Sequence, residues 1–438
     1  MKKEKIGFIS LGCSKNRVDS ERIMGLLKEN FDFTGDPKDA DYIFVNTCGF
    51  IDPAKEESIN TILEMAEYKK DKCKKLFVLG CLAQRYAEEL KESMPEIDRI
   101  ITIDEYPRLK EIMKEETSLS FTLQNPERLL STENWLAYLK IAEGCYNKCA
   151  YCAIPLIRGS FISEDEDFLV DEATKLVNQG VKELVVVAQD PTNYGMDLYK
   201  EKRLGHLIKR LDKITGIEWI RILYLYPGVV NEELLYDLKE CKHFIPYFDM
   251  PLQYGNDHML KAMYRIGSVS SFKKIKKKIG ELFPDAIFRT TLMVGFPGET
   301  EKDFLELLDF IKENRFDRMG AFSYSKEENT PAYSYPDQVH YKTKERRLRT
   351  LMETQKEISQ ERGERLVGKV LRVIIEGTDD TGFYTGRSYA SAPDQVDGIV
   401  TISSYNKHDL GDMIYVRILS SEEYDLFGEE TGSSDTIY

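Results

Sequence analysis

A tight group of cysteines lies near the middle of the chain, in the run Gly144-Cys145-Tyr-Asn-Lys-Cys149-Ala-Tyr-Cys152. Three thiolates from one loop can hold three irons of a cubic cluster and leave the fourth iron open to a small ligand. Structural zinc usually takes four protein ligands at other spacings. Cys145, Cys149 and Cys152, called the central trio below, therefore predict an iron-sulfur cluster, and a zinc-stabilised binding module is the alternative.

A second set of cysteines is spread over the first part of the chain. Cys13, Cys48 and Cys81, called the N-terminal trio below, each follow a short apolar run, and 35 and 33 residues separate them. Ligands of a parallel α/β fold bind outside the carboxyl ends of its strands, so cysteines at equivalent strand ends can converge. We expect a second cluster there. Cys73 and Cys241 stand alone and fit the common role of cysteine as a small buried hydrophobe.

The elements that would position these cysteines fall into several parts. A chain of 438 residues with 42% hydrophobic and 31% charged residues is globular and too long for one core. Residues 1–118 alternate apolar runs (6–11, 42–46 and 76–79) with helical patterns, which predicts a parallel α/β domain. The polar stretch 119–134 contains Asn125-Pro126 and is expected to be a linker.

A second α/β series follows in residues 135–363. Its strand candidates are 137–142, 184–188, 219–225, 245–250, 287–294 and 320–324. About six such repeats predict a partial (β/α)6 barrel, in which active residues lie at the C-terminal ends of strands. Residues 364–438 alternate short strands with turns and predict a small antiparallel β-barrel. The expected fold class is therefore α/β with a C-terminal β-barrel.

Charge and hydropathy narrow the functional classes. The net charge of -14 and the pI near 5.1 argue against a nonspecific nucleic-acid binder. The sequence has no apolar run of about 18 residues and no signal-peptide pattern at its start, so we expect a cytoplasmic location and no membrane span. The lysine-rich stretch 272–280 and the arginine-rich stretch 342–349 predict amphipathic helices with solvated faces, and contact with RNA is the alternative.

The central trio, with an aromatic residue (Tyr151) before its last cysteine, resembles the signature of the radical S-adenosylmethionine superfamily. The N-terminal trio resembles the first domain of the methylthiotransferase family within it, and the final barrel resembles their TRAM domain. The resemblance therefore covers nearly the whole chain. Several runs are similar to the RimO branch, which modifies an aspartate of small-subunit ribosomal protein number twelve: 154–159, 223–227, 248–253, 322–325 and 386–390. Asn329 replaces a more usual glycine, a change that left-handed geometry tolerates.

This resemblance implies two 4Fe-4S clusters, one on each cysteine trio, and two uses of S-adenosylmethionine. One molecule donates a methyl group to sulfur on the auxiliary cluster, held by the N-terminal trio. The other yields a 5′-deoxyadenosyl radical that abstracts hydrogen from the aspartate β-carbon. S-adenosylmethionine contacts are implied at Tyr151, Gln189, Gly295, Gly298 and Glu299. For the last three, a plain strand-to-helix turn is the alternative, because short glycine turns are weak motifs.

The resemblance also implies partners. A ribosomal protein is the expected substrate, and flavodoxin or ferredoxin is the expected electron donor. A tRNA methylthiotransferase and a non-catalytic electron-transfer protein are the alternative functions. Residues 364–438 carry fourteen acidic and six basic side chains, a net charge of -8. Such a barrel suits a basic protein better than a phosphate backbone, with ribosomal RNA contact through a basic patch as the alternative.

Overall fold

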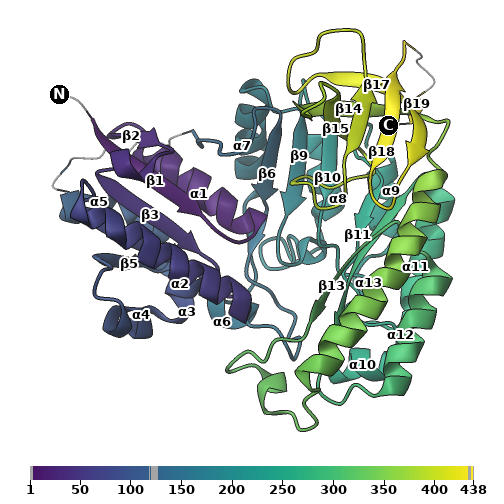
Figure 1. Ribbon diagram of the computed structural model, residues 1–438, viewed down its shortest axis with the longest axis horizontal. Coiled ribbons are helices and arrows are strands. Elements are labelled where there is room, and N and C mark those ends of the chain that lie inside the picture. The colour runs from purple at the N-terminus through teal and green to yellow at the C-terminus, as the bar shows by residue number, and fades with distance from the viewer. Residues whose placement is uncertain (1–2, 118, 120–126, 433–435, 438) are drawn as a thin grey trace.

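The computed structural model describes residues 3–117, 119, 127–432 and 436–437. Three domains follow one another along the chain, with an N-terminal α/β domain, a central α/β domain and a C-terminal β-barrel (Figure 1). Residues 120–126 of the expected linker lie outside the described part. Within the described residues, no helix has the length and apolarity needed to cross a membrane.

The N-terminal domain is built on a fully parallel sheet with the strand order β2-β1-β3-β4-β5. Helices α1 and α5 pack on one face, and α2 to α4 pack on the other. The short edge strands β2 and β5 carry too few residues for a sequence pattern and were not predicted. The elements are β1 (Glu4–Ser10), α1 (Ser14–Leu27), β2 (Phe31–Thr34), β3 (Tyr42–Thr47), α2 (Asp52–Glu67), β4 (Lys75–Gly80), α3 (Cys81–Arg85), α4 (Ala87–Ser93), β5 (Arg99–Ile101) and α5 (Leu109–Thr117).

The central domain contains two parallel three-stranded sheets, β6-β9-β10 and β11-β12-β13, joined by a bridge between Ile220 and Phe244. Together they form the predicted partial barrel. The elements are β6 (Leu136–Lys140), β7 (Ala142–Glu143), α6 (Ile154–Ile157), β8 (Ile162–Ser163), α7 (Glu166–Asn178), β9 (Glu183–Val187), α8 (Leu204–Leu211), β10 (Trp219–Ile222), α9 (Glu232–Lys239), β11 (Tyr247–Asp249), α10 (Asp257–Ala262), α11 (Val269–Leu282), β12 (Ile287–Val294), α12 (Glu301–Asn314), β13 (Arg318–Ser323) and α13 (Tyr341–Glu364).

The C-terminal domain is a small closed barrel, as predicted. Its ring runs β14-β15-β16-β18-β17 and closes on β14. Strand β18 was not predicted, and its pairing with β16 is parallel, so the ring is not antiparallel throughout. The elements are β14 (Val370–Thr378), β15 (Tyr384–Ser388), β16 (Val400–Ser403), β17 (Met413–Ser421), β18 (Leu426–Glu430) and β19 (Thr436–Ile437).

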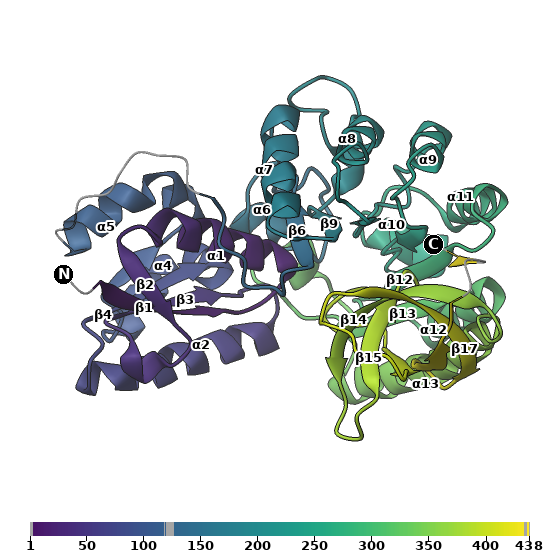
Figure 2. The ribbon, with the colours of Figure 1, turned by 90° about the horizontal axis from the view of Figure 1, so that it is seen from above.

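The barrel packs against the strands of the central domain, and the two share one hydrophobic cluster (Figure 2). A buried ion triad lies in this interface. The Glu183 carboxylate accepts hydrogen bonds from Arg221 Nε at 2.8 Å and from Arg387 Nη2 at 2.6 Å. All three side chains are at most 1% exposed. Burial would raise the pKa of Glu183, but Arg387 and Arg221 outweigh it and lower that pKa.

The basic stretches form the amphipathic helices expected from the sequence. In α11, Phe272 and Ile279 are buried, while Lys273 pairs with Glu313 at 2.6 Å. In α13, Arg346 and Arg347 both pair with Glu301 of the neighbouring α12. These three cations pair with acids of the same domain, which leaves less free positive charge for RNA. Lys273 is partly exposed and Arg346 is exposed, as expected, whereas Arg347 is buried.

We expect Glu183→Gln to lower the free energy of unfolding by about 3–5 kcal/mol, because it leaves two buried guanidinium groups without a counter-charge. Glu218→Gln is the matched control. Glu218 also joins the central domain to the barrel, through Arg372 at 2.9 Å, but it is 37% exposed, so its loss should cost about 1 kcal/mol or less. Urea unfolding at neutral pH measures both variants.

The Glu183 contribution should persist at neutral pH and disappear as the pH falls through the lowered pKa of its carboxyl group. Equal losses in the two variants would contradict a structural role for the buried triad.

Candidate functional site

The N-terminal trio lies at one edge of the first sheet, because Cys13, Cys48 and Cys81 follow the adjacent strands β1, β3 and β4. Two glycines let the loops approach. Gly12 has φ +87°, and a Cβ there would lie 2.9 Å from Cys48 Cβ. A Cβ on Gly49 would lie 2.9 Å from the Leu82 backbone. Larger residues would push the cysteine-bearing loops apart.

The central trio lies on the loop that follows β7. Cys145 Sγ accepts hydrogen bonds from the backbone N–H of Asn147 at 3.4 Å and from its side-chain amide at 3.5 Å. Asp190, at the end of β9, accepts a 2.7 Å hydrogen bond from the same amide. Arg265 Nη1 approaches Cys149 Sγ at 3.6 Å. The loop is therefore held by Asp190, which follows β9, and by Arg265, which lies between α10 and α11.

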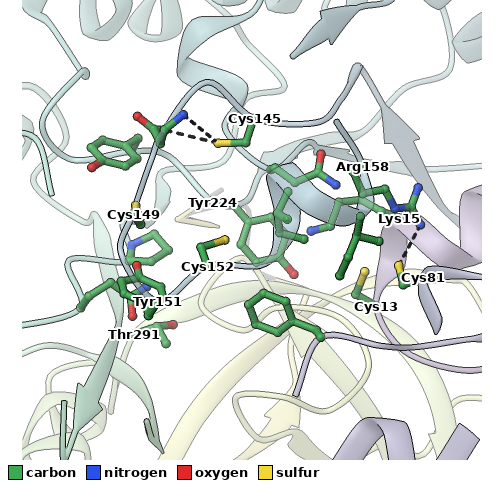
Figure 3. Close-up of a pocket in the computed structure, with 18 of the residues that line it drawn as sticks. Cys13, Lys15, Cys81, Cys145, Cys149, Tyr151, Cys152, Arg158, Tyr224 and Thr291 are labelled. Carbon is green, nitrogen blue, oxygen red and sulfur yellow. Dashed lines mark hydrogen bonds between the residues drawn. The ribbon is translucent and has the colours of Figure 1, made fainter. Parts of the chain in front are cut away.

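One cavity of about 360 Å³ is lined by all six cysteines. Figure 3 shows the central trio on one side of it, Cys13 and Cys81 on the other, and Lys15 and Tyr224 between them. Arg158 follows the central trio in sequence, yet it reaches the N-terminal trio, where its Nη2 lies 3.4 Å from Cys81 Sγ. The fold thus places both trios around a shared space.

Burial raises the pKa of four of these thiols. It raises the pKa of Cys48 and of Cys145 to about 11 and that of Cys152 to about 12. Burial also raises the pKa of Cys81, although Arg158 opposes it. For Cys13, burial is outweighed by Lys15 and nearby backbone N–H groups, so its pKa is lowered. Because metals bind thiolates, metal binding at the four raised thiols would release protons near neutral pH.

Among the described residues, no three His, Cys, Asp or Glu side chains are grouped so that they could hold a single metal ion. A cubic cluster does not require its three thiolates to converge on one metal ion, because each thiolate binds its own iron. The structure places the three thiols of each trio on the wall of the same cavity.

Two of the residues expected to contact S-adenosylmethionine line the cavity, namely Tyr151 and Gln189. Gln189 donates to Glu143 at 3.3 Å, while its Oε1 atom is buried without a hydrogen-bond partner.

Gly295, Gly298 and Glu299 are not among the described residues that line the cavity. The buried Glu299 carboxylate is held instead by Tyr254 Oη at 2.8 Å and Arg347 Nη1 at 2.8 Å. This arrangement favours the alternative of a structural strand-to-helix turn for that segment, and a direct contact there remains only a prediction.

Other lining residues were not predicted as contacts from the sequence. Gln253 adopts φ +79° and has a buried Oε1 atom without a partner. Tyr226 stacks on the Arg265 guanidinium at 4.0 Å. Tyr226 lies in the run 223–227, directly after β10, and Gln253 lies at the end of the run 248–253, shortly after β11. Their positions at strand ends of the barrel could have identified them from the sequence.

We expect the two trios to assemble clusters independently, because separate domains scaffold them. Replacing Cys145, Cys149 and Cys152 together by Ala should leave about half of the iron and sulfide of the unaltered protein. The reciprocal triple variant of Cys13, Cys48 and Cys81 should also keep about half. Iron analysis and absorbance of anaerobically reconstituted protein measure this. Loss of all iron from either folded variant would contradict two separate sites.

Models of three protein families match the chain. Residues 5–102 match "Uncharacterized protein family UPF0004", residues 139–311 match the radical SAM superfamily, and residues 367–430 match the TRAM domain. These three segments correspond to the N-terminal domain, most of the central domain and the barrel.

Solved structures share the fold at low sequence identity. A radical S-adenosylmethionine methyltransferase, TsrM from Kitasatospora setae, matches with a TM-score of 0.56 and 13% identity over 76% of this chain and 77% of that one. The cobalamin-dependent S-adenosylmethionine radical enzyme OxsB matches with a TM-score of 0.52 and 11% identity over 75% of this chain and 54% of that one.

Relatives of high identity cover almost the full length. The ribosomal protein uS12 methylthiotransferase RimO of Alkaliphilus oremlandii is 48% identical over 97% of this chain and 98% of its own. Its counterpart in Acetivibrio thermocellus is 45% identical over 99% of both chains. With such identity along all three domains, the chain belongs to the RimO family of ribosomal protein uS12 methylthiotransferases.

Proposed function

We propose that this chain is a radical S-adenosylmethionine enzyme that attaches a methylthio group to the β-carbon of an aspartate in ribosomal protein uS12. One observation carries the proposal: two cysteine trios from different domains line the same cavity. An electron-transfer protein has no need of a shared cavity between its centres. The full-length similarity to uS12 methylthiotransferases favours this substrate over tRNA.

Cys145, Cys149 and Cys152 would hold the radical-forming 4Fe-4S cluster, and Cys13, Cys48 and Cys81 would hold the auxiliary one. When bound, the clusters and S-adenosylmethionine supply the hydrogen-abstracting radical and the methylthio group. The protein's part is to hold these groups on opposite sides of one space, so that a substrate side chain between them is within reach of both.

The cavity fits S-adenosylmethionine in one specific respect. The side-chain oxygens of Gln189 and Gln253 are buried acceptors without a partner among the described residues. A buried acceptor without a donor is costly, and the ammonium group of a bound amino acid would satisfy both. We infer that these two residues, with Tyr151, contact the methionine moiety.

The remaining lining residues shield the reaction. Phe50, Ile154, Ile157 and Phe322 provide apolar walls that limit access of water to a reactive radical. None of the described lining residues is Asp, Glu or His. Hydrogen-atom abstraction requires no ionisable base, so this composition agrees with radical chemistry.

The proposed setting is the cytoplasm, with flavodoxin or ferredoxin as electron donor and the acidic barrel as the surface that attracts the basic ribosomal protein. Much of the barrel's acidity serves internal structure. Asp397 binds Arg289, Glu376 binds Arg387, and Asp379 accepts hydrogen bonds within its own turn. The exposed acids Asp380, Asp409, Glu422 and Glu429 form no ion pair in the described structure and are left to meet a partner.

We expect the fourfold variant Asp380→Lys, Asp409→Lys, Glu422→Lys and Glu429→Lys to bind isolated uS12 at least about tenfold more weakly at low salt, because the complementary charge is reversed. The difference should shrink as salt screens the charges. Titration of labelled uS12 measures binding, and deoxyadenosine formation without substrate is the control. Unchanged affinity at low salt would refute the role of the barrel.

Mass spectrometry tests the proposed function. Cells that lack this chain should contain uS12 without the methylthio group, and restoring the chain should restore the modification. The tRNA from both strains should carry the same methylthio nucleosides. A change in tRNA with unaltered uS12 would assign the enzyme to the tRNA branch.

A further inference from the structure

The cavity between the trios is lined by three cationic side chains, Lys15, Arg158 and Arg265. Arg158 is fully engaged, with Asp19 Oδ2 at 2.7 Å and Glu143 Oε2 at 2.8 Å. Arg265 is held by the Pro251 carbonyl oxygen, by Cys149 and by the ring of Tyr226. The partners of these two guanidinium groups are therefore residues of the protein itself.

Lys15 differs from both. It is 9% exposed, and within the described structure its ammonium group forms no hydrogen bond or ion pair. The centroid of the Tyr224 ring lies 3.9 Å from Lys15 Nζ, and Cys13 and Glu143 are near enough to attract its charge without a hydrogen bond. A buried ammonium without a hydrogen-bond acceptor is costly. Such a group is retained where a ligand supplies the missing acceptor.

The position of Lys15 is fixed by its surroundings. It lies two residues after Cys13 in the first turn of α1, and Tyr224 lies between it and Cys152 (Figure 3). Tyr224 adopts φ +68°, an unfavourable conformation for tyrosine, and its N–H donates to Asp249 Oδ2 at 2.9 Å. The strained residue thus places its ring against the ammonium group of Lys15, on the side that faces Cys152.

We infer that Lys15 binds the carboxylate of the substrate aspartate and so places the neighbouring β-carbon between the two trios. This inference rests on the proposed function. A carboxylate would give the Lys15 ammonium group the hydrogen-bond acceptor that it lacks, and the lining residues contain no competing Asp or Glu. The methionine carboxylate of S-adenosylmethionine has the same chemistry, but Lys15 belongs to the N-terminal trio's side of the cavity.

The test measures binding of two synthetic peptides to the enzyme with both clusters, without reductant. One peptide spans the modified aspartate of uS12, and the other carries asparagine in its place. The unaltered enzyme should prefer the aspartate peptide by at least about tenfold, as one charge-assisted hydrogen bond supplies. Lys15→Met should bind both peptides equally, near the affinity of the unaltered enzyme for the asparagine peptide. Lys15→Arg should keep a preference.

Matched measurements separate the possible outcomes. Lys277→Met removes one exposed lysine of α11 and should leave the preference intact. Iron content reports folding, and Lys15→Gln replaces Lys15→Met if the latter loses iron. A neutral variant that retains the preference overturns the site. Weaker S-adenosylmethionine binding with an unchanged peptide preference assigns Lys15 to the methionine carboxylate and overturns the inference. An unaltered enzyme that binds neither peptide overturns the proposed function as well.

Discussion

The arrangement of the site depends on a buried ion network between the first two domains. Asp19 of α1 accepts from Arg158 Nη1 at 2.7 Å and also pairs with Lys140 of β6. Burial opposes ionisation of Asp19, but Lys140 and Arg158 outweigh it and lower its pKa to about 2. Asp19 is therefore ionised at neutral pH. Since Arg158 also contacts Cys81, the interaction that joins the domains sets the position of one cysteine trio relative to the other.

The C-terminal barrel also helps to hold the N-terminal domain against the central domain. Asp394 accepts from Arg17 of α1 at 3.0 Å and from Tyr138 Oη of β6 at 2.6 Å, so a single barrel residue touches both other domains. Arg17 and Asp19 belong to the helix that begins directly after Cys13. The first helix is thus held from two directions. A barrel that serves only to recruit a partner would not need contacts with both other domains.

Local patterns in the sequence predicted the two groups of cysteines and most of the strands. The spacing of the central trio and the strand-end positions of Cys13, Cys48 and Cys81 predicted both groups of thiols, because a parallel sheet gathers its strand ends at one edge. Alternation and apolar runs identified most strands. Strands β2, β5 and β18 were missed because short edge and closing strands leave weak patterns. The approach of the trios could not be predicted, since it depends on contacts between Asp19 and Arg158, which are distant in the sequence.

The sequence also predicts only some of the residues that line the cavity, because others are brought there by contacts distant in the sequence. The resemblance pointed to Gln189, and the strand-end position of Gln253 could have identified it, whereas the burial of Lys15 against the ring of Tyr224 is a property of the folded chain. At Glu299 the structure favours the structural alternative, while the expected ligand contact stays a prediction. A glycine turn before a helix suggests a ligand site, yet here its carboxylate holds Arg347 of α13. A local motif therefore indicates a role, and the contacts that its residues make in the folded chain are needed to judge it.

The central claim is that both cysteine trios hold clusters that face one shared space. Electron paramagnetic resonance of the reduced, anaerobically reconstituted protein tests it most directly, with Mössbauer spectroscopy to count the irons. We expect two cubic clusters per chain and a magnetic interaction between them that disappears when either trio is replaced by alanine. A single cluster per chain, or two clusters whose signals are simply additive, would contradict it.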